Sequence, residues 1–271
     1  MRCLIRRVIT PLTLVSSVEA FDTIMSKPRI LCLHGKAQTA ESFSKKIGGA
    51  RRKLERAFDL TFLDGPIDLG DLVEQQQQHQ QQQQSSTTIM NTGRAWFLRE
   101  LVDDGDGAAA TGEEHENEYR YIKLTDAVEY VARFAMDNGR YDAVMGFSQG
   151  GTLATALATS GAVPVRAVLT AGSPHIEEAF VAASDWARKS RRKESSTYTG
   201  EEQVDADIGL TIPKLHLAGE TDAMISTEST ERLAERGGNG EMIVHEKGHL
   251  FPTRAVHVDR MVEFLKSSLE P

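Results

Sequence analysis

The chain has 271 residues, 40% of them hydrophobic and 26% charged, which is the composition of an ordinary globular protein. Its formal net charge of −8 argues against a nucleic-acid binder, which needs a basic face, and fits a soluble enzyme that acts on neutral or weakly charged substrates. No run of apolar residues is long enough to span a membrane, and two cysteines, Cys3 and Cys32, are too few for a disulfide framework.

We expect residues 1–26 to form a disordered tail or a targeting segment, because Arg2, Arg6 and Arg7 precede the first acidic residue. We expect residues 27–271 to form one domain, since no internal repeat and no second core are evident. The scarcity of cysteine favours a reducing compartment. We therefore expect a cytoplasmic protein, or a mitochondrial or plastid one if residues 1–25 are a transit peptide.

The first part of this domain contains two low-complexity inserts. Patterning predicts a strand over 28–35, a helix over 39–57 and a strand over 58–63. An insert at about 70–92 follows, in which residues 75–84 are glutamine except for His79, and we expect a disordered loop there. A second soft insert, 103–118, is rich in acidic residues and glycine. The aromatic segment between them, 94–98, is expected to pack against the main body close to the site.

Strands and helices alternate through the rest of the chain. Strands are predicted over 141–145, 165–169, 213–218 and 241–245, and helices over 124–138, 176–193 and 227–235, with a further helix at the end of the chain. This alternation predicts an α/β fold with a mostly parallel, doubly wound sheet and helices on both faces.

The most informative motif is the G-x-S-x-G run from Gly146 to Gly150. A predicted strand precedes it and an alanine-rich helix follows it, so the glycines permit a sharp turn that holds the Ser148 hydroxyl outward. A capping serine at an ordinary turn is the alternative. The strand before and the helix after favour a nucleophile.

A serine nucleophile needs a base and an acid, which in hydrolase sheets follow it in the order acid, then histidine. Asp222 follows a predicted strand, with Glu220 as a second candidate on the same loop; helix capping is the other explanation for Asp222. His249 lies at a glycine turn before the last helix. His245 and His257 fall within a strand and a helix, so we expect structural or surface roles for them.

An oxyanion hole is the third requirement. We expect its donors to be the backbone N–H groups of Gln149, directly after the nucleophile, and of Lys36, in the loop after the first strand. Six residues are expected to line the substrate site: His34, Gly35, Trp96, Phe97, Phe147 and His175. We expect no metal and no organic cofactor, and oligomeric state is left open.

Several segments together resemble the FSH-type family serine hydrolases of the α/β-hydrolase superfamily. They are Leu33-His34-Gly35, Arg94-Ala95-Trp96-Phe97, Gly146-Phe147-Ser148-Gln149-Gly150-Gly151, Gly219-Glu220-Thr221-Asp222 and Gly248-His249-Leu250-Phe251-Pro252. The resemblance implies an α/β-hydrolase fold, with Ser148, Asp222 and His249 matching the family's nucleophile, acid and base. It further implies hydrolysis of small acyl esters or thioesters.

The chain departs from that family pattern at Lys36, at Lys247 and at Ala171-Gly172, and it adds the two inserts. None of these departures removes a member of the expected triad. The competing hypothesis is a non-enzymatic binding or assembly protein on a retained hydrolase scaffold, with the glutamine tract making the contacts.

Overall fold

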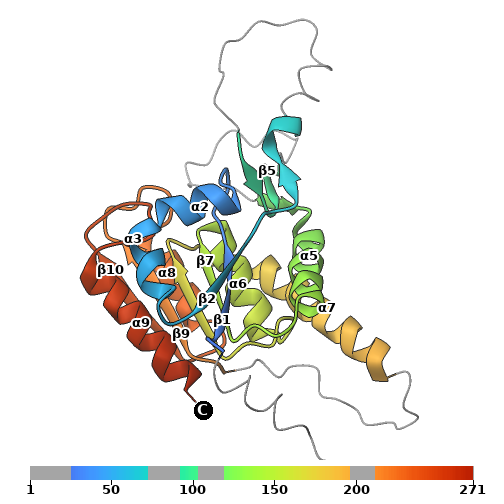
Figure 1. Cartoon of the computed structure of the whole chain (residues 1–271). Coiled ribbons are helices and arrows are strands. Elements are labelled where there is room, and N and C mark those ends of the chain that lie inside the picture. The colour runs from blue at the N-terminus through green and yellow to red at the C-terminus, as the bar shows by residue number, and fades with distance from the viewer. Residues whose placement is uncertain (1–25, 73–91, 103–118, 196–210, 271) are drawn as a thin grey trace, which may run out of the picture.

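The computed structural model describes residues 26–72, 92–102, 119–195 and 211–270 (Figure 1). Its centre is a parallel six-stranded sheet in the order β10-β9-β8-β7-β1-β2. The strands are β1 (Arg29–Leu33), β2 (Asp59–Leu63), β7 (Ala143–Phe147), β8 (Ala167–Ala171), β9 (Lys214–Gly219) and β10 (Gly240–His245). This is the predicted α/β-hydrolase architecture.

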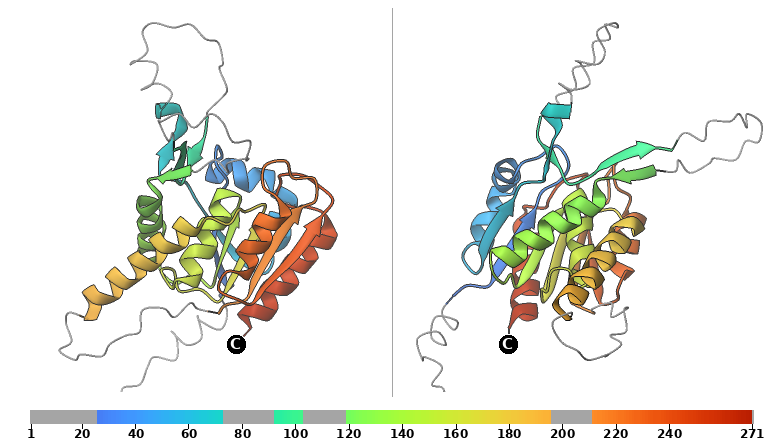
Figure 2. Two further views of the ribbon diagram at one scale, coloured as in Figure 1. Left: turned by 180° about the vertical axis from the view of Figure 1, so that it is seen from behind. Right: turned by 90° about the vertical axis from the view of Figure 1, so that its right-hand side faces the viewer.

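Helices cover both faces of the sheet, as predicted (Figure 2). One face carries α5 (Leu124–Asp137), α6 (Gln149–Thr159), α7 (Glu177–Ser195) and α8 (Thr227–Glu235), and the other carries α2 (Ala40–Lys46), α3 (Gly48–Leu54) and α9 (Ala255–Leu269). Successive side chains of a strand point to opposite faces. In β1, accordingly, Leu31 and Leu33 join the first core while Ile30 and Cys32 join the second.

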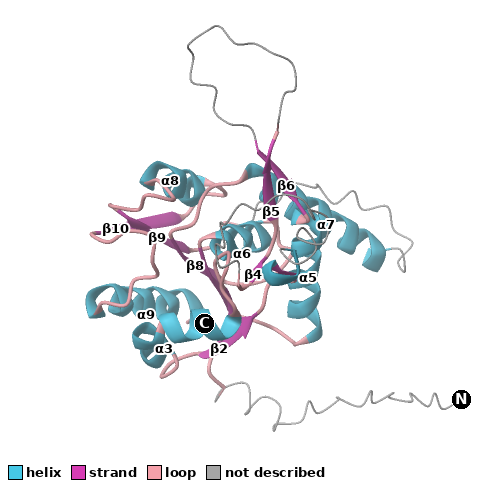
Figure 3. Cartoon of the chain, turned by 90° about the horizontal axis from the view of Figure 1, so that it is seen from above, coloured by secondary structure: helices cyan, strands magenta, loops and turns pink. Residues whose placement is uncertain are grey.

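Two small antiparallel pairs lie outside the main sheet. They are β3 (Ile67–Asp68) with β4 (Arg94–Ala95), and β5 (Leu98–Leu101) with β6 (Tyr119–Ile122). The view from above shows β5 and β6 lying over the end of the sheet near α6 and α7 (Figure 3). The hairpin therefore stands beside the edge of the sheet where parallel strands present their carboxyl ends.

The order of strands reverses direction between β1 and β7. From β1 the chain moves to β2 on one side, whereas β7, β8, β9 and β10 follow one another on the other side. In open α/β sheets such a switch point leaves a crevice at the carboxyl ends of the two strands. The loop after β1 and the turn after β7 therefore meet there.

Several element boundaries differ from the prediction, and three of the differences have a clear local reason. The helix expected over 39–57 is two helices that meet at Ile47, where the backbone leaves helical geometry (φ −89°, ψ 16°) just before two glycines of low helix propensity. The strands expected over 141–145 and 165–169 each lie two residues later, as β7 and β8, because pairing with their neighbours sets their ends.

The first insert begins later than expected. Residues 69–72 are helical, and Leu72 packs against a small core of Ile67, Leu69 and Ala95. The rest of that insert, the acidic insert over 103–118 and the tail over 1–25 lie outside the described residues.

Candidate active site

Ser148 occupies a strained turn between β7 and α6. Its backbone has φ 51° and ψ −122°, a conformation that side chains other than glycine rarely adopt. The flanking glycines make this turn possible. A Cβ on Gly146 would lie 2.5 Å from the carbonyl oxygen of Gly150, and one on Gly150 would lie 2.4 Å from that of Leu33. The sequence motif thus forms a sharp turn that raises the serine from the end of the strand.

Ser148, His249 and Asp222 form a hydrogen-bonded row. The Nε2 atom of His249 lies 3.1 Å from Ser148 Oγ, and its Nδ1 atom lies 2.7 Å from Asp222 Oδ2. The three residues follow β7, β10 and β9, so the carboxyl ends of parallel strands bring them together across 101 positions of sequence.

Asp222 is fixed by more than the histidine. Its other oxygen, Oδ1, accepts the backbone N–H groups of Met224 (2.8 Å) and Ile225 (3.0 Å), and its side chain is 1% exposed. Asp222 does not cap α8, the alternative role considered for it from the sequence, because the N-cap of that helix is Ser226; Asp222 Oδ1 instead closes the turn that precedes the helix. Glu220, the second candidate acid, is exposed.

The imidazole of His249 is confined from two sides. Phe147 packs against it with ring centroids 4.9 Å apart. On the other side Gly172 has φ 53°, and a Cβ there would lie 3.2 Å from His249 Nδ1 and 3.4 Å from Asp222 Oδ2. Absence of a side chain at position 172 therefore leaves room for the Asp222–His249 hydrogen bond.

The two expected oxyanion donors lie on segments that touch at Ser148. A Cβ on Gly35 would lie 2.8 Å from the Phe147 ring and 3.4 Å from Ser148 Cβ, so the loop after β1 passes directly against the turn. Among the described residues, no hydrogen bond uses the backbone N–H of Lys36 or of Gln149. The N–H of Gln149 opens α6, where the first amides of a helix are unsatisfied.

His34 and Trp96 do not line the site, contrary to the prediction, because both side chains are completely buried. His34 Nδ1 lies 2.7 Å from the carbonyl oxygen of Gly35, and its Nε2 accepts the N–H of Gly65 (2.9 Å). Burial lowers the pKa of this histidine, so the neutral ring with its proton on Nδ1 satisfies both contacts. Trp96 donates its indole N–H to the carbonyl oxygen of His34 (2.7 Å).

The aromatic segment instead supports the turn at Ser148. The Gln149 side chain accepts the N–H of Trp96 (2.9 Å) and donates to the carbonyl oxygen of Phe97 (2.7 Å). Gln149, the residue after Ser148, is therefore bound to the Arg-Ala-Trp-Phe segment through both the oxygen and the nitrogen of its side-chain amide.

A cavity of about 630 Å³ contains Ser148. Of the residues expected to line it, Phe97 and His175 do, and Gly35 does not. Phe147 lines a separate hollow of about 310 Å³, together with Phe43, His249 and Phe251. Sequence analysis missed most of the wall: Arg99, Tyr121, Pro174, Ile176, Met224, Ile225, Ser226 and Ser229. Several of these residues lie close in sequence to the aromatic segment or to Asp222, and that proximity could have indicated that they line the cavity.

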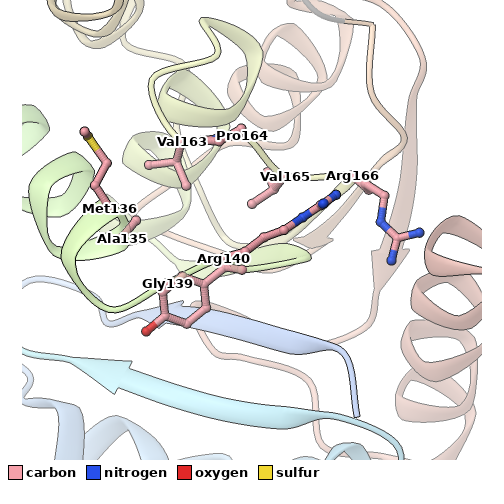
Figure 4. Close-up of a pocket in the computed structure, with 9 residues that line it drawn as sticks. Ala135, Met136, Gly139, Arg140, Val163, Pro164, Val165 and Arg166 are labelled. Carbon is pink, nitrogen blue, oxygen red and sulfur yellow. The ribbon is translucent and has the colours of Figure 1, made fainter. Parts of the chain in front are cut away.

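A third cavity, of about 570 Å³, lies at the opposite end of the sheet (Figure 4). Its walls come from the segments that precede β7 and β8, including Arg140, Val163, Pro164 and Arg166, whereas Ser148 follows β7. This cavity is therefore separate from the serine site.

Nothing in the described part of the chain indicates a metal centre, since no three histidine, cysteine, aspartate or glutamate side chains cluster as ligands would. Cys32 is buried, and burial raises the pKa of its thiol, as expected for a core residue. Over the same described ranges, no helix combines the length and apolar character needed to cross a membrane.

Several known proteins are similar in sequence to most of this chain. An uncharacterized hydrolase, C22A12.06c, of Schizosaccharomyces pombe is 25% identical over 89% of this chain, and esterase OVCA2 of Danio rerio is 25% identical over 88% of this chain and 96% of its own length. This chain spans about half the length of some curated relatives, 51% of the S. pombe hydrolase among them.

A solved structure shows the same fold. Acyl-protein thioesterase 2 of Zea mays has 13% sequence identity and a TM-score of 0.53, over 90% of this chain and 95% of that one. The family model described as serine hydrolase (FSH1) matches residues 24–261, which is most of the sequence. The chain therefore belongs to the FSH1 serine hydrolase family.

Proposed function

We propose that the protein hydrolyses acyl esters or thioesters through an acyl-enzyme intermediate, with Ser148 as nucleophile, His249 as general base and Asp222 as the orienting acid. The observation that carries this proposal is the row of hydrogen bonds from Asp222 Oδ2 through His249 to Ser148 Oγ, at 2.7 and 3.1 Å. Membership of a serine hydrolase family supports it, as do relatives that are named esterases.

In the first half of the proposed reaction, Ser148 Oγ attacks the carbonyl carbon while its proton passes to His249 Nε2. The Asp222 carboxylate stabilises the imidazolium that forms. The negative charge on the carbonyl oxygen is stabilised by the N–H groups of Lys36 and Gln149. Collapse of the tetrahedral intermediate expels the alcohol or thiol, which takes the proton from His249 and leaves Ser148 acylated.

In the second half, water enters the cavity beside Ser148 and attacks the acyl carbon. His249 accepts a proton from that water, and the second tetrahedral intermediate collapses to a carboxylic acid with the proton returned to Ser148. Apart from the substrate and this water, every group used in these steps is a side chain or backbone N–H group of the chain.

The test is turnover of p-nitrophenyl esters and acyl thioesters of increasing chain length, with the Ser148→Ala variant as control. We expect the wild-type protein to hydrolyse at least one member of the series. The variant should lose at least about a thousandfold in kcat, since triad members act as a unit, and should keep its urea unfolding midpoint. A folded wild-type protein that hydrolyses no ester or thioester would favour the non-enzymatic assembly hypothesis instead.

A further inference from the structure

Among the described residues, the cavity beside Ser148 is lined by the two basic residues Lys36 and Arg99 and by no aspartate or glutamate. The chain as a whole carries a formal net charge of −8. A basic cavity in an acidic protein concentrates substrates of opposite charge, because low-dielectric walls focus the local field.

Arg99 reaches this cavity from the β5–β6 hairpin. It pairs directly with Tyr121 in the antiparallel register, so the two side chains share one face, and both line the cavity. Its guanidinium lies over the Tyr119 ring, 4.2 Å from the ring centroid. Stacking holds the guanidinium plane in place and leaves its N–H groups available to a ligand.

The other face of the hairpin shows how an arginine is paired when it has a structural partner. Glu100 and Arg120 are the neighbouring pair in the register, and they form an ion pair of 3.2 Å. Arg99 forms no ion pair with a carboxylate among the described residues. Within the part of the chain that the structure describes, Arg120 thus pairs with a carboxylate of the hairpin, whereas Arg99, which lines the cavity, pairs with none.

Two carboxylates at the start of α7 lie close to residues of the cavity wall. Glu177 is engaged by Arg236 (2.7 Å) and lies 3.3 Å from His175 Nε2. Glu178 adds to burial in raising the pKa of Tyr121, so that phenol is protonated at neutral pH and can donate a hydrogen bond into the cavity. Neither glutamate is part of the cavity wall.

We propose that the natural substrate carries a carboxylate in addition to its reactive ester or thioester, and that the guanidinium of Arg99 binds this carboxylate with Lys36 adding charge. A guanidinium presents a planar fork that matches a carboxylate with two parallel hydrogen bonds. Phe97, Ile176 and Ile225 supply apolar wall in the same cavity. This inference rests on the proposed function, because it names the substrate class of the same site.

The test compares two pairs of esters that differ only in charge. p-Nitrophenyl hydrogen glutarate carries a carboxylate on the acyl side, and its methyl ester is the neutral match. p-Butyryloxybenzoate carries a carboxylate on the leaving group, and its methyl ester is the neutral match. The quantity of interest is the ratio of kcat/KM for the charged ester to that for its neutral match. Comparing this ratio between variants cancels differences in intrinsic reactivity.

In Arg99→Gln we expect this ratio to fall about tenfold to a hundredfold for one of the two pairs, since a hydrogen bond to a charged group is lost. The loss should lie mainly in KM. Arg99→Lys should lose less, because it keeps the charge without the fork. Lys36→Met should lower the ratio by a smaller factor, and added salt should lower it in the wild type. The pair that responds identifies the side of the ester that bears the carboxylate.

Arg120→Gln is the matched control, since Arg120 lies on the same hairpin facing away and already pairs with Glu100. It should leave both ratios unchanged. If Arg99→Gln leaves both ratios within twofold of wild type, or if Arg120→Gln lowers them equally, the inference is overturned while ester hydrolysis by Ser148 stands. If the wild-type protein hydrolyses none of the four esters but does hydrolyse a neutral ester or thioester of the chain-length series, the inference is overturned and the proposed function stands; if it hydrolyses no member of either set, the proposed function itself fails.

Discussion

Replacing Asp222 by asparagine tests the orienting role of the acid, and the structure specifies how the new side chain will sit. Oδ1 accepts two backbone N–H groups, from Met224 and Ile225. The asparagine must keep its carbonyl oxygen at that position, because an amide NH₂ placed there would face two donors. The NH₂ group then occupies the place of Oδ2, 2.7 Å from His249 Nδ1.

This arrangement forces the imidazole into the wrong tautomer. With an N–H donor opposite it, Nδ1 of His249 has to accept, so the ring proton moves to Nε2, which faces Ser148 Oγ at 3.1 Å. A protonated Nε2 cannot take the serine proton. The same substitution in a serine protease triad lowers kcat by about 10⁴-fold, equivalent to about 5 kcal/mol of lost transition-state stabilisation.

The assay is kcat for a p-nitrophenyl ester, with the urea unfolding midpoint recorded to show that Asp222→Asn is folded. Glu220→Gln is the matched control, because Glu220 lies on the same loop and is exposed, and it should keep kcat within twofold. A folded Asp222→Asn that loses less than about tenfold in kcat would refute this reasoning. A large loss of kcat in Glu220→Gln, with kcat retained in Asp222→Asn, would identify Glu220 as the orienting acid instead.

Two further predictions concern buried groups around the sheet. His216 is fully buried, and burial lowers its pKa from 6.5 to about 3, so only the unfolded state takes up a proton as the pH falls below 6.5. From pH 7 to pH 5 this proton uptake removes about 2 kcal/mol from the free energy of unfolding. Urea titrations of His216→Leu should not show this loss. If the free energy of unfolding falls equally with pH in the wild type and the variant, the prediction is wrong. Gly172→Ala places a methyl group against His249 Nδ1 and should therefore lower kcat. Gly238→Ala is the control, because Gly238 has a similar φ of 66° but only one atom within 4.0 Å of the added methyl group. It should cost about 1–2 kcal/mol of stability without loss of kcat. Wild-type kcat in Gly172→Ala would show that the imidazole tolerates the methyl group.

Sequence patterning predicted which helices and strands alternate along the chain more accurately than it predicted where each of them begins and ends. The run before Ser148 is apolar on both faces, which predicts a buried parallel strand, but pairing with β1 and β8 shifts that strand two residues along. The helix predicted over 39–57 breaks at Ile47, where local geometry next to two glycines overrides the apolar spacing.

The candidate triad could be predicted because each member follows a strand, and parallel strands present their carboxyl ends together. The lining of the cavity could not be predicted in the same way. His34 and Trp96 lie in the segments that the site requires, yet the fold turns both side chains inward as hydrogen-bonding supports. The place of Arg99 in the cavity wall depends on the pairing of β5 with β6, which are separated in sequence by residues 103–118. No local sequence pattern reveals such a non-local contact.

The central claim is that Ser148 is the nucleophile, and covalent labelling tests it most directly. The wild-type protein should be treated with a fluorophosphonate probe and the modified peptide identified by mass spectrometry, beside Ser148→Ala. We predict one adduct, on Ser148 Oγ, and no adduct in the variant. A probe bound to another residue, or undiminished labelling of the variant, would contradict the account.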